Sequence, residues 1–515
     1  MAGIESEYPS IMNLAEAARF IRVSKKTMGE MARQGRLPCN RVGREWRFLR
    51  AGLEEWLRGE GRIDSSVDEE QKPVQPGPNQ ARLFGEAGFR DTAFSQNRTE
   101  PIHRWVPWIA GFSSSFVQGV FESLLSGQKG KRIILDPFAG VGTTLVEGIK
   151  RGYGVAGFEI NPYAYLACKV KLGSRDYPPE LLRERIRIFR NYISEKLSNG
   201  KAPVSLPPAD FRSRVAFFSP RVERKVLLAL DFISRQEEWV KDIFRLALGA
   251  VMVGFSNYSY EPSLGRRATS GKSDILDADV AGIIAGKLEE FVQDIIYLRS
   301  VVKTDNGNPA FSLFNQSYFE MNGELRSKSI DLLVTSPPYL NNYHYVRNTR
   351  PQLYWLGLAT ESLKKLEESS FGKYWQTVRS RPRVEPEFEI RELKSIIAKI
   401  RQINPEKGPY GGPGWANYAT TYFNDCLKFL KESRRVMKKG APVVVVIGNN
   451  ILQGIEIKTD LFFAQLGEQL GYRIIDLHQV RTKRTGSSII NSSVRVGSQS
   501  GRAKLYETAV ELRAP

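Results

Sequence analysis

The chain has 515 residues, and its 75 Lys and Arg exceed its 56 Asp and Glu, which gives a formal net charge of +19. This length and an apolar content of 41% predict a folded protein of about three domains and exclude a disordered or fibrous chain. Purely apolar runs such as residues 443–447 are far shorter than the roughly 20 residues of a membrane-spanning helix, so we expect a cytoplasmic protein. The positive charge indicates a polyanionic partner, with nucleic acid ahead of an anionic membrane surface.

Cysteine and histidine are rare. Three of each occur, and they are widely separated along the chain. So few side chains of these types build neither a disulfide framework nor a zinc cluster, and we therefore expect no metal cofactor.

Two short helices are predicted near the N-terminus. Asn13 precedes an apolar-periodic run that starts at Leu14, and Glu16 follows three residues later, which is typical of a capped helix start. Ser24 can cap a second helix that runs to Gln34. Two helices joined by so short a turn predict a helix-turn-helix.

A small β-hairpin is predicted next, because residues 41–48 alternate around a glycine, and a third helix is expected at 53–57. The expected core of this unit comprises Leu14, Ala18, Ile21, Met28, Met31, Trp46 and Phe48. The stretch LAEAARFIRVSKKTMGEMARQGRLP followed by RVGREWRF resembles the excisionase-type winged helix-turn-helix, over about residues 10–57. That resemblance implies a second helix in the major groove and a wing along a phosphate strand, with DNA contacts from Lys25, Lys26, Thr27, Arg41, Arg44 and Arg47. The alternative for the three arginines is a solvated hairpin surface.

These observations predict a winged helix-turn-helix domain at 1–57. Residues 58–80 contain almost no large apolar side chain and close with three prolines, which predicts a flexible linker. From residue 81 to 515, apolar and aromatic residues continue without a comparable gap. We therefore expect one large domain with insertions.

Four near-continuous apolar runs lie in the large domain, at 132–135, 154–160, 330–334 and 443–447. Runs of this kind, separated by helical stretches, predict an α/β fold with a parallel sheet buried on both faces. Between the second and third runs, residues 172–310 show helical spacing of apolar side chains, and we interpret them as a helical insertion.

The segment DPFAGVGTT, residues 136–144, follows the first predicted strand and opens a helix. Gly140 and Gly142 allow a sharp turn and a close approach of the backbone to a ligand. A dinucleotide loop would have a third glycine where Leu145 stands. Glu159 ends the next strand, where a carboxylate can accept hydrogen bonds from both hydroxyls of a ribose. The alternative is a tight turn without a ligand.

This segment resembles the motif D-P-F-x-G-x-G-T-T of S-adenosylmethionine-dependent DNA amino-methyltransferases, and GFEINPYA at 157–164 resembles their next, acidic segment. The resemblance implies a Rossmann-like class I methyltransferase fold and S-adenosylmethionine as the cofactor. It implies cofactor contacts from Asp136, Phe138, Gly140, Gly142, Thr143, Thr144 and Glu159, with Phe112 and Ser113 as candidates in a preceding segment. Where the family usually has an acid that contacts the adenine, this chain offers Ser317 or Asn315.

The third predicted strand ends in the tetrapeptide Ser336-Pro337-Pro338-Tyr339. An exocyclic amine is a poor nucleophile because its lone pair is delocalised into the ring of the base. The Ser336 hydroxyl and the Pro337 carbonyl can accept both amino hydrogens, and the prolines hold these acceptors in place. Tyr339 can stack on a base that has been flipped out of the duplex. The tetrapeptide is therefore the predicted catalytic site.

In the resembling family, Ser in the first position is more frequent in cytosine-N4 enzymes, and Asp or Asn in adenine-N6 enzymes. We therefore expect methylation of cytosine N4 in double-stranded DNA, with adenine N6 as the alternative. A DNA-binding regulator with a degenerate methyltransferase domain and methylation of RNA are further alternatives, which the intact motifs and the duplex-reading resemblance disfavour. A cognate restriction endonuclease is a candidate partner, and a membrane is not.

Two segments are candidates for reading the target. The insertion carries a polar loop with Arg266 and Arg267, and residues 360–421 carry a glycine-aromatic loop with Tyr410 and Trp415. The latter segment is the candidate target-recognition region, in which Trp415 is a candidate base contact, or else a core residue or a lid on the cofactor pocket. The basic stretch 480–504 is expected to follow DNA phosphates, or else to be a solvated loop; its candidate contacts are Arg481, Lys483 and Arg484.

Overall fold

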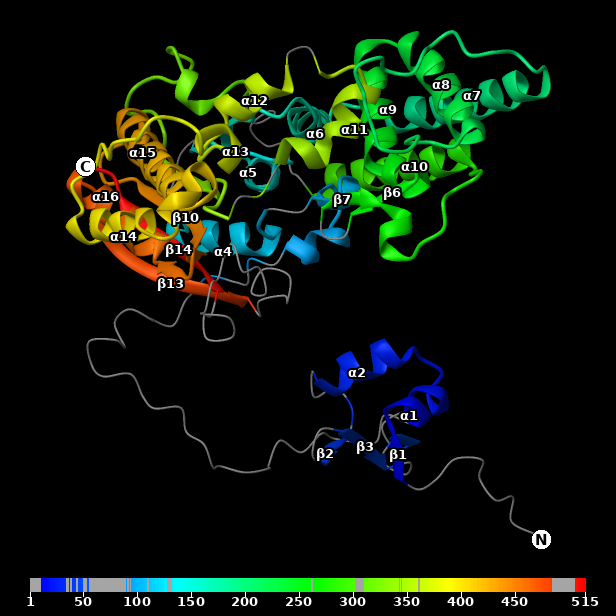
Figure 1. The fold of residues 1–515 in the computed structure, drawn as a ribbon. Helices are drawn as coiled ribbons and strands as arrows, with labels where there is room; N and C mark the ends of the chain where they lie inside the picture. The colour runs from blue at the N-terminus through cyan, green and yellow to red at the C-terminus, as the bar shows by residue number, and fades with distance from the viewer. Residues whose placement is uncertain are drawn as a thin grey trace. The chain divides into compact units, whose positions relative to one another are not determined.

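The computed structural model of the chain divides into two compact units, Met1–Gly77 and Pro78–Pro515 (Figure 1). It describes residues 11–33, 37, 39–42, 45–49, 53–54, 89, 92, 94–108, 111–126, 132–260, 263–301, 310–341, 343, 345–359, 362–483 and 505–515.

In the part of the N-terminal unit that the structure describes, two helices lie beside a three-stranded antiparallel sheet of order β1-β3-β2. Its elements are β1 (Ile11–Asn13), α1 (Leu14–Phe20), α2 (Lys25–Arg33), β2 (Asn40–Val42) and β3 (Glu45–Leu49). The Asn13 side chain accepts hydrogen bonds from the backbone of Ala15 and Glu16, and the Glu16 carboxylate accepts one from the Asn13 backbone at 2.8 Å. Ser24 Oγ accepts from the Thr27 backbone at 3.0 Å. Both predicted helix starts and the hairpin are thereby confirmed.

A separate small core holds this unit together. The buried members are Met12, Ala17, Ala18, Met28, Ala32, Leu37, Phe48 and Leu53. Ala18, Met28 and Phe48 were predicted core residues. The other predicted members, Leu14, Ile21, Met31 and Trp46, are partly buried and pack against this core.

The large unit is built on a seven-stranded sheet within the described residues, in the order β13-β14-β10-β9-β4-β5-β8. The strands are β4 (Ile133–Asp136), β5 (Gly154–Phe158), β8 (Phe311–Phe314), β9 (Leu332–Thr335), β10 (Pro442–Gly448), β13 (Arg473–Lys483) and β14 (Leu505–Arg513). The five strands from β10 to β8 are mutually parallel, and β14 runs antiparallel to both of its neighbours. This is the predicted Rossmann-like methyltransferase fold, and each of the four predicted strands is present.

Both faces of the sheet are covered, which explains why the predicted strands read as continuous apolar runs. Val444 and Val446 of β10 belong to one core, and Val443, Val445 and Ile447 belong to the other. The first core contains residues of α4 (Ser114–Leu125), α5 (Thr143–Lys150) and α6 (Pro162–Gly173). The second contains residues of α15 (Gly412–Val436) and α16 (Thr459–Gln469).

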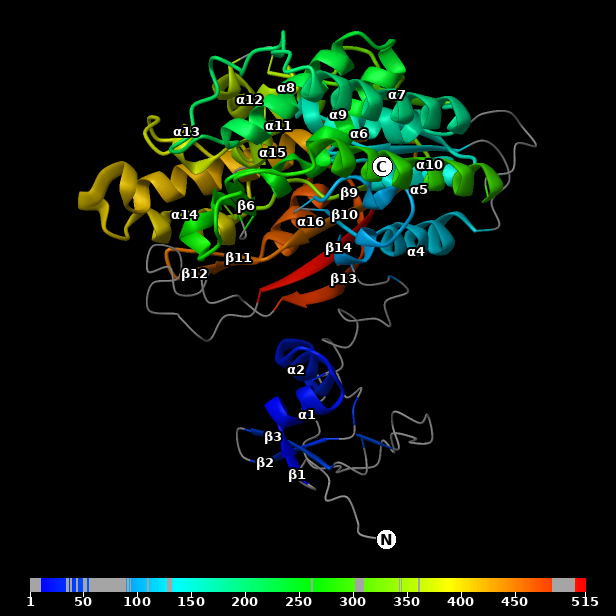
Figure 2. The ribbon, with the colours of Figure 1, turned by 90° about the vertical axis from the view of Figure 1, so that its right-hand side faces the viewer.

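Between β5 and β8, a group of helices extends the first core (Figure 2). These are α7 (Pro179–Ser198), α8 (Pro220–Ser234), α9 (Glu238–Val251) and α10 (Val280–Val301), with β6 (Tyr258–Tyr260) and β7 (Leu264–Arg266) as a hairpin and η3 (Met252–Phe255) and η4 (Arg267–Ser270) beside it. Helix α10 packs on α7 and α9, and α9 packs on α6. Asp294 of α10 accepts hydrogen bonds from the Ile102 backbone at 2.7 Å and from the Trp105 indole at 2.9 Å, so these helices also hold the segment that precedes α4.

Several shorter elements complete the unit. They are η1 (Phe94–Arg98), η2 (His103–Trp105), η5 (Tyr318–Glu320), α11 (Tyr345–Trp355), α12 (Leu363–Ser369), α13 (Trp375–Val378), α14 (Arg391–Arg401), η6 (Pro405–Tyr410), β11 (Asn450–Leu452) and β12 (Ile455–Ile457). Across the described parts of the chain, none of the helices has both the length and the apolar character of a membrane span.

Candidate active site

A cavity of about 570 Å³ lies where four neighbouring parallel strands end. Its lining includes Phe138 after β4, Glu159 after β5, Ser317 after β8 and Ser336 after β9. Ligands collect at this edge in open parallel sheets because the loops that follow the strands converge there. The cavity therefore joins the predicted cofactor loop and the predicted catalytic tetrapeptide in one space.

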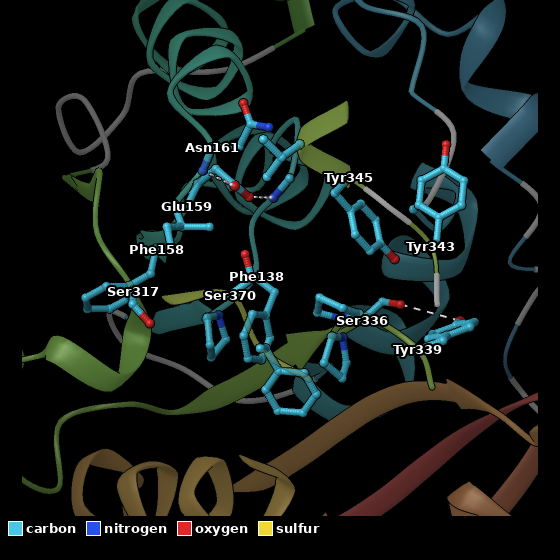
Figure 3. Close-up of a pocket in the computed structure, with 18 of the residues that line it drawn as sticks. Phe138, Phe158, Glu159, Asn161, Ser317, Ser336, Tyr339, Tyr343, Tyr345 and Ser370 are labelled. Atoms are coloured by element: carbon cyan, nitrogen blue, oxygen red, sulfur yellow. Dashed lines mark hydrogen bonds between the residues drawn. The ribbon is translucent and has the colours of Figure 1, made fainter. Parts of the chain in front are cut away.

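The other walls come from parts of the chain that are far apart in sequence. The residues before α4 contribute Trp108, the β6–β7 hairpin contributes Tyr260, and α12 with the loop after it contributes residues 366–374 in part. Arg481 of β13 and Glu507 of β14 complete the lining. Figure 3 shows Phe158, Glu159 and Ser317 gathered at one end of the cavity, and Ser336, Tyr339, Tyr343 and Tyr345 at the other.

The two loop glycines have left-handed backbone angles, with φ of +53° at Gly140 and +85° at Gly142. A Cβ atom at Gly142 would lie 3.0 Å from the Cys168 sulfur, so the loop packs closely on α6. Gly140 lines the cavity, and Gly142 is the N-cap residue of α5. The loop therefore needs glycine at both positions, the first beside the cavity and the second against the protein interior.

Glu159 is half-buried, and each of its carboxylate oxygens accepts a backbone hydrogen bond. Oε1 accepts from Asn161 N and Oε2 from Gly140 N, both at 2.7 Å. Burial raises the pKa of Glu159 to about 7, although these hydrogen bonds act in the opposite direction. The carboxylate thus fixes the glycine loop while it faces the cavity (Figure 3).

Asp136 is buried and does not line the cavity. Its Oδ1 accepts hydrogen bonds from the Thr335 hydroxyl at 2.6 Å and from Phe138 N at 3.1 Å. Burial raises its pKa to about 6. Because Thr335 directly precedes the tetrapeptide, this carboxylate connects the cofactor loop with the catalytic loop.

Four further predicted cofactor residues are turned into the protein, namely Thr143, Thr144, Phe112 and Ser113. Thr144 Oγ1 donates to Val334 O at 3.3 Å, and the Thr143 hydroxyl lies 3.5 Å from Asn97 Nδ2. Ser113 caps α4 by accepting from Phe116 N at 3.1 Å, and Phe112 is buried beside Phe116. The predicted cofactor residues that line the cavity are Phe138, Gly140, Glu159 and Ser317; those that do not are Asp136, Gly142, Thr143, Thr144, Phe112 and Ser113.

All four tetrapeptide residues line the cavity. Ser336 Oγ donates to Tyr339 Oη at 3.4 Å, and Tyr339 Oη donates to Glu507 Oε1 at 3.4 Å. Burial raises the pKa of Tyr339 well above its usual value, so its hydroxyl stays protonated. The tetrapeptide is therefore hydrogen-bonded to a carboxylate of the antiparallel strand, which the sequence analysis did not include in the site.

Other cavity residues also escaped the sequence analysis. Asn161 stands inside the matched segment, where its side chain caps α6 and donates to Thr349 Oγ1 at 2.7 Å. Tyr260 and Glu507 had no local signal, because they reach the site only through the tertiary fold. Tyr260, Tyr343 and Tyr345 were not among the predicted site residues, although Tyr343 and Tyr345 closely follow the tetrapeptide.

The predicted DNA contacts fall into three groups. Lys25, Lys26 and Thr27 are exposed in the first turn of α2, and the Thr27 hydroxyl is hydrogen-bonded to Ser24 Oγ at 2.7 Å. Arg41 and Arg47 lie on β2 and β3, and Arg44 lies outside the described residues. In the large unit, Arg266 ends β7 and Arg267 donates to Ser273 O at 2.8 Å. Arg481 lines the cavity and Lys483 ends β13. Arg484 lies outside the described residues.

Trp415 is a core residue, which removes it as a base contact. It is buried in α15, and its ring stacks on Trp375 with centroids 4.9 Å apart. Tyr410 is exposed, with the Arg379 guanidinium 4.3 Å from its ring centroid. Within the residues that the structure describes, no three His, Cys, Asp or Glu side chains gather as a metal site.

Comparison with known proteins gives two kinds of similarity. Residues 11–61 match the helix-turn-helix domain family HTH_17. Much longer matches cover 84% of this chain and 91% of the type II methyltransferase M.AvaI of Nostoc sp. (strain PCC 7120), at 26% identity. The type II methyltransferase M.BsoBI of Geobacillus stearothermophilus is 22% identical, over 77% of this chain and 83% of its own length. M.MvaI of Kocuria varians, also a type II methyltransferase, is 24% identical, over 80% of this chain and 92% of its own length. Together with the matched motifs and the sheet order, these similarities identify the chain as a relative of the type II methyltransferases with a helix-turn-helix domain at its N-terminus.

Proposed function

We propose that this protein is a DNA methyltransferase that transfers a methyl group from S-adenosylmethionine to the exocyclic amine of a flipped base. The proposed base is cytosine, and the methylated atom is its N4. The observation that carries the proposal is the shared cavity. A carboxylate and glycine loop suited to a nucleoside, Glu159 and Gly140, face the same space as Ser336 and Tyr339. One cavity can thus hold a methyl donor and an acceptor base side by side.

The residues at the Glu159 end fit the proposed cofactor. Phe138, Phe158 and Ile160 supply apolar surface for an adenine, and the Glu159 carboxylate can accept from ribose hydroxyls. A side chain at Gly140 would need a strained backbone and would extend toward the Trp108 indole, 3.5 Å from its Cβ. When bound, S-adenosylmethionine supplies an electrophilic methyl group on a sulfonium.

At the other end, the tetrapeptide would activate the amine. The Ser336 hydroxyl donates toward Tyr339, which leaves its lone pairs for an amino hydrogen of the base. The Pro337 carbonyl would accept the second hydrogen, so the nitrogen lone pair would turn out of the ring plane. The Tyr339 ring would stack on the extruded base. Ser at the first position favours cytosine N4 through the family resemblance, and adenine N6 is the second candidate.

Double-stranded DNA is the proposed partner. The helix-turn-helix match, the exposed Lys25 and Lys26 at the start of α2, and the net charge of +19 support it. A cognate restriction endonuclease is a further proposed partner, since the chain is similar to type II methyltransferases.

The test is mass spectrometry of modified bases in DNA from cells that express the protein. We expect N4-methylcytosine with the wild type and its loss with Ser336→Ala and Tyr339→Ala, because both side chains act on the base in the transition state. Ser370→Ala is the matched control, since Ser370 also lines the cavity but lies outside the tetrapeptide. N6-methyladenine would select the second base, and wild-type modification in both tetrapeptide variants would exclude this site.

A further inference from the structure

Methyl transfer to an amine creates a proton that must leave. As the nitrogen bonds to the methyl carbon, it becomes a cationic centre that still carries both of its hydrogens. A serine hydroxyl accepts a hydrogen bond but does not retain a proton near neutral pH. An enzyme with serine at the first position of the tetrapeptide therefore needs another group to receive this proton.

The structure contains a chain of hydroxyl groups that runs from Ser336 to a carboxylate. Ser336 Oγ donates to Tyr339 Oη, and Tyr339 Oη donates to Glu507 Oε1, each at 3.4 Å. Figure 3 draws the first of these bonds as a dashed line. Both hydroxyls point their hydrogens the same way, away from the position of the amine. A proton accepted by Ser336 can therefore be passed along without reversal of either bond.

Glu507 is built into the site. Only 6% of this residue is exposed, and it lines the cavity. Its second oxygen, Oε2, accepts from the buried Thr92 hydroxyl at 2.8 Å, which leaves Oε1 for Tyr339. Gly448 lies opposite Glu507 on β10, and a Cβ atom there would be 2.8 Å from Tyr506 O, 3.7 Å from the Tyr339 ring and 3.8 Å from Glu507 Cγ. Because residue 448 is a glycine, the Tyr339 ring and the Glu507 side chain can both lie close to it on β10.

The charged surroundings of Glu507 come from three sides. Arg481 is its cross-strand neighbour on β13 and also lines the cavity. Tyr339 faces it from the loop after β9. On α16, Asp460 is hydrogen-bonded to Tyr506 and Thr508, whose side chains alternate with that of Glu507 along β14.

We propose that Glu507 receives the proton released by the methylated amine, through Tyr339 and Ser336; this rests on the proposed function. The amine nitrogen forms the bond to the methyl carbon while the carbon–sulfur bond breaks and leaves its electron pair on sulfur. One amine proton moves to Ser336 Oγ, the Ser336 proton moves to Tyr339 Oη, and the Tyr339 proton moves to Glu507 Oε1. The base becomes a neutral methylamine, and Glu507 later returns the proton to water.

The test is single-turnover methyl transfer to a duplex that the wild type methylates. Glu507→Gln should lower the rate by about 100-fold at pH 7, because a general base contributes at least that much. The pH dependence of the rate should also change with this substitution, and Glu507→Asp should recover part of the rate and of the wild-type profile. Glu511→Gln is the matched control, since Glu511 lies on the same face of β14 and is equally buried, but bonds to His478. Calorimetry should find S-adenosylhomocysteine and DNA bound as tightly by Glu507→Gln as by the wild type.

A second variant covers the case in which Glu507→Gln unfolds. Tyr339→Phe keeps the stacking ring and removes the middle hydroxyl, so it should lose a similar factor, and the double variant should lose no more than either single one. A Tyr339→Phe rate within about threefold of the wild type, or a folded Glu507→Gln that matches Glu511→Gln in rate and pH profile, would overturn the inference while the proposed function stands. A wild type that transfers no methyl group to DNA would overturn both.

Discussion

The proposed cofactor site should respond to pH through Glu159. An ionised carboxylate accepts hydrogen bonds from both ribose hydroxyls, whereas a protonated one carries a donor in place of an acceptor. Because burial raises the pKa of Glu159 to about 7, the ionised form disappears as the pH falls through neutrality. Affinity for an adenosyl ligand should therefore be highest above pH 8 and fall toward pH 5.

The size of this effect follows from a single titrating group. With a pKa of about 7, about one carboxylate in 11 is ionised at pH 6 and about one in 100 at pH 5, so the apparent Kd should rise by up to those factors. These are upper limits, because the carbonyl oxygen of the protonated acid still accepts one hydrogen bond. The rise at pH 6 corresponds to about 1.4 kcal/mol of binding free energy.

Calorimetric titration with S-adenosylhomocysteine between pH 5 and 8 would measure it. Glu159→Gln is the matched variant: it lacks the titration, and any protonation of the ligand itself appears in both proteins and cancels in their difference. Asp136→Asn is a second control, for the titration of a neighbouring carboxylate. The pKa of Asp136 is raised to about 6, and the charge of Asp136 repels that of Glu159. If wild type and Glu159→Gln changed affinity in parallel across this range, Glu159 would not be the ribose acceptor.

Three further predictions concern the rest of the molecule. Asp294→Ala should lower the free energy of unfolding, measured in denaturant titrations, by about 3–5 kcal/mol. The substitution removes the carboxylate that accepts hydrogen bonds from the buried Trp105 indole and from the Arg104 guanidinium. A loss below about 1 kcal/mol would contradict this prediction. Burial lowers the pKa of Lys171 to about 7, so between pH 7 and 10 the unfolded chain holds a proton on this lysine that the folded chain has lost. The free energy of unfolding of the wild type, measured relative to that of Lys171→Met, should therefore rise from pH 7 to 10. A difference between the two proteins that stays constant over this range would refute the prediction. Deletion of residues 1–80 should leave methylation of short duplexes detectable but raise the KM for DNA. The salt dependence of DNA binding should become less steep, by about one unit per lost phosphate contact. A truncated protein that folds and binds cofactor but methylates nothing would make the N-terminal domain part of target recognition.

The strands that could be predicted from the sequence are those in the middle of the sheet. Burial on both faces makes β10 and its parallel neighbours continuous apolar runs, and such runs stand out in a sequence. The strands β8, β13 and β14 were not predicted. Strand β8 lies at one edge, with Phe311 exposed, and β13 lies at the other. Strand β14 carries the buried carboxylates Glu507 and Glu511, so polar residues interrupt its pattern even though it lies inside the sheet, between β13 and β10.

The site motifs lead to loops that border the cavity, but only some of their side chains line it. The motif at 136–144 marks a backbone shape, and many of its side chains maintain that shape: Asp136 bonds Thr335, and Thr144 bonds the end of β9. In contrast, Glu507 reaches the tetrapeptide only because β14 inserts between β13 and β10. A single sequence carries no local sign of that neighbour, since the pairing depends on the completed sheet.

The walls of the cavity also bear on how a target base would be read. Tyr260 of the β6–β7 hairpin donates to Asn348 O at 2.7 Å, and Leu264 N donates to Asn348 Oδ1 at 3.0 Å, so the hairpin is fixed to α11, just beyond the tetrapeptide. Another part of the lining comes from residues of 366–374, which belong to the segment predicted to recognise the target. A base in this cavity would therefore be exposed to both the hairpin and that segment. We therefore expect substitutions on either wall to alter target choice, because neither wall encloses the base by itself.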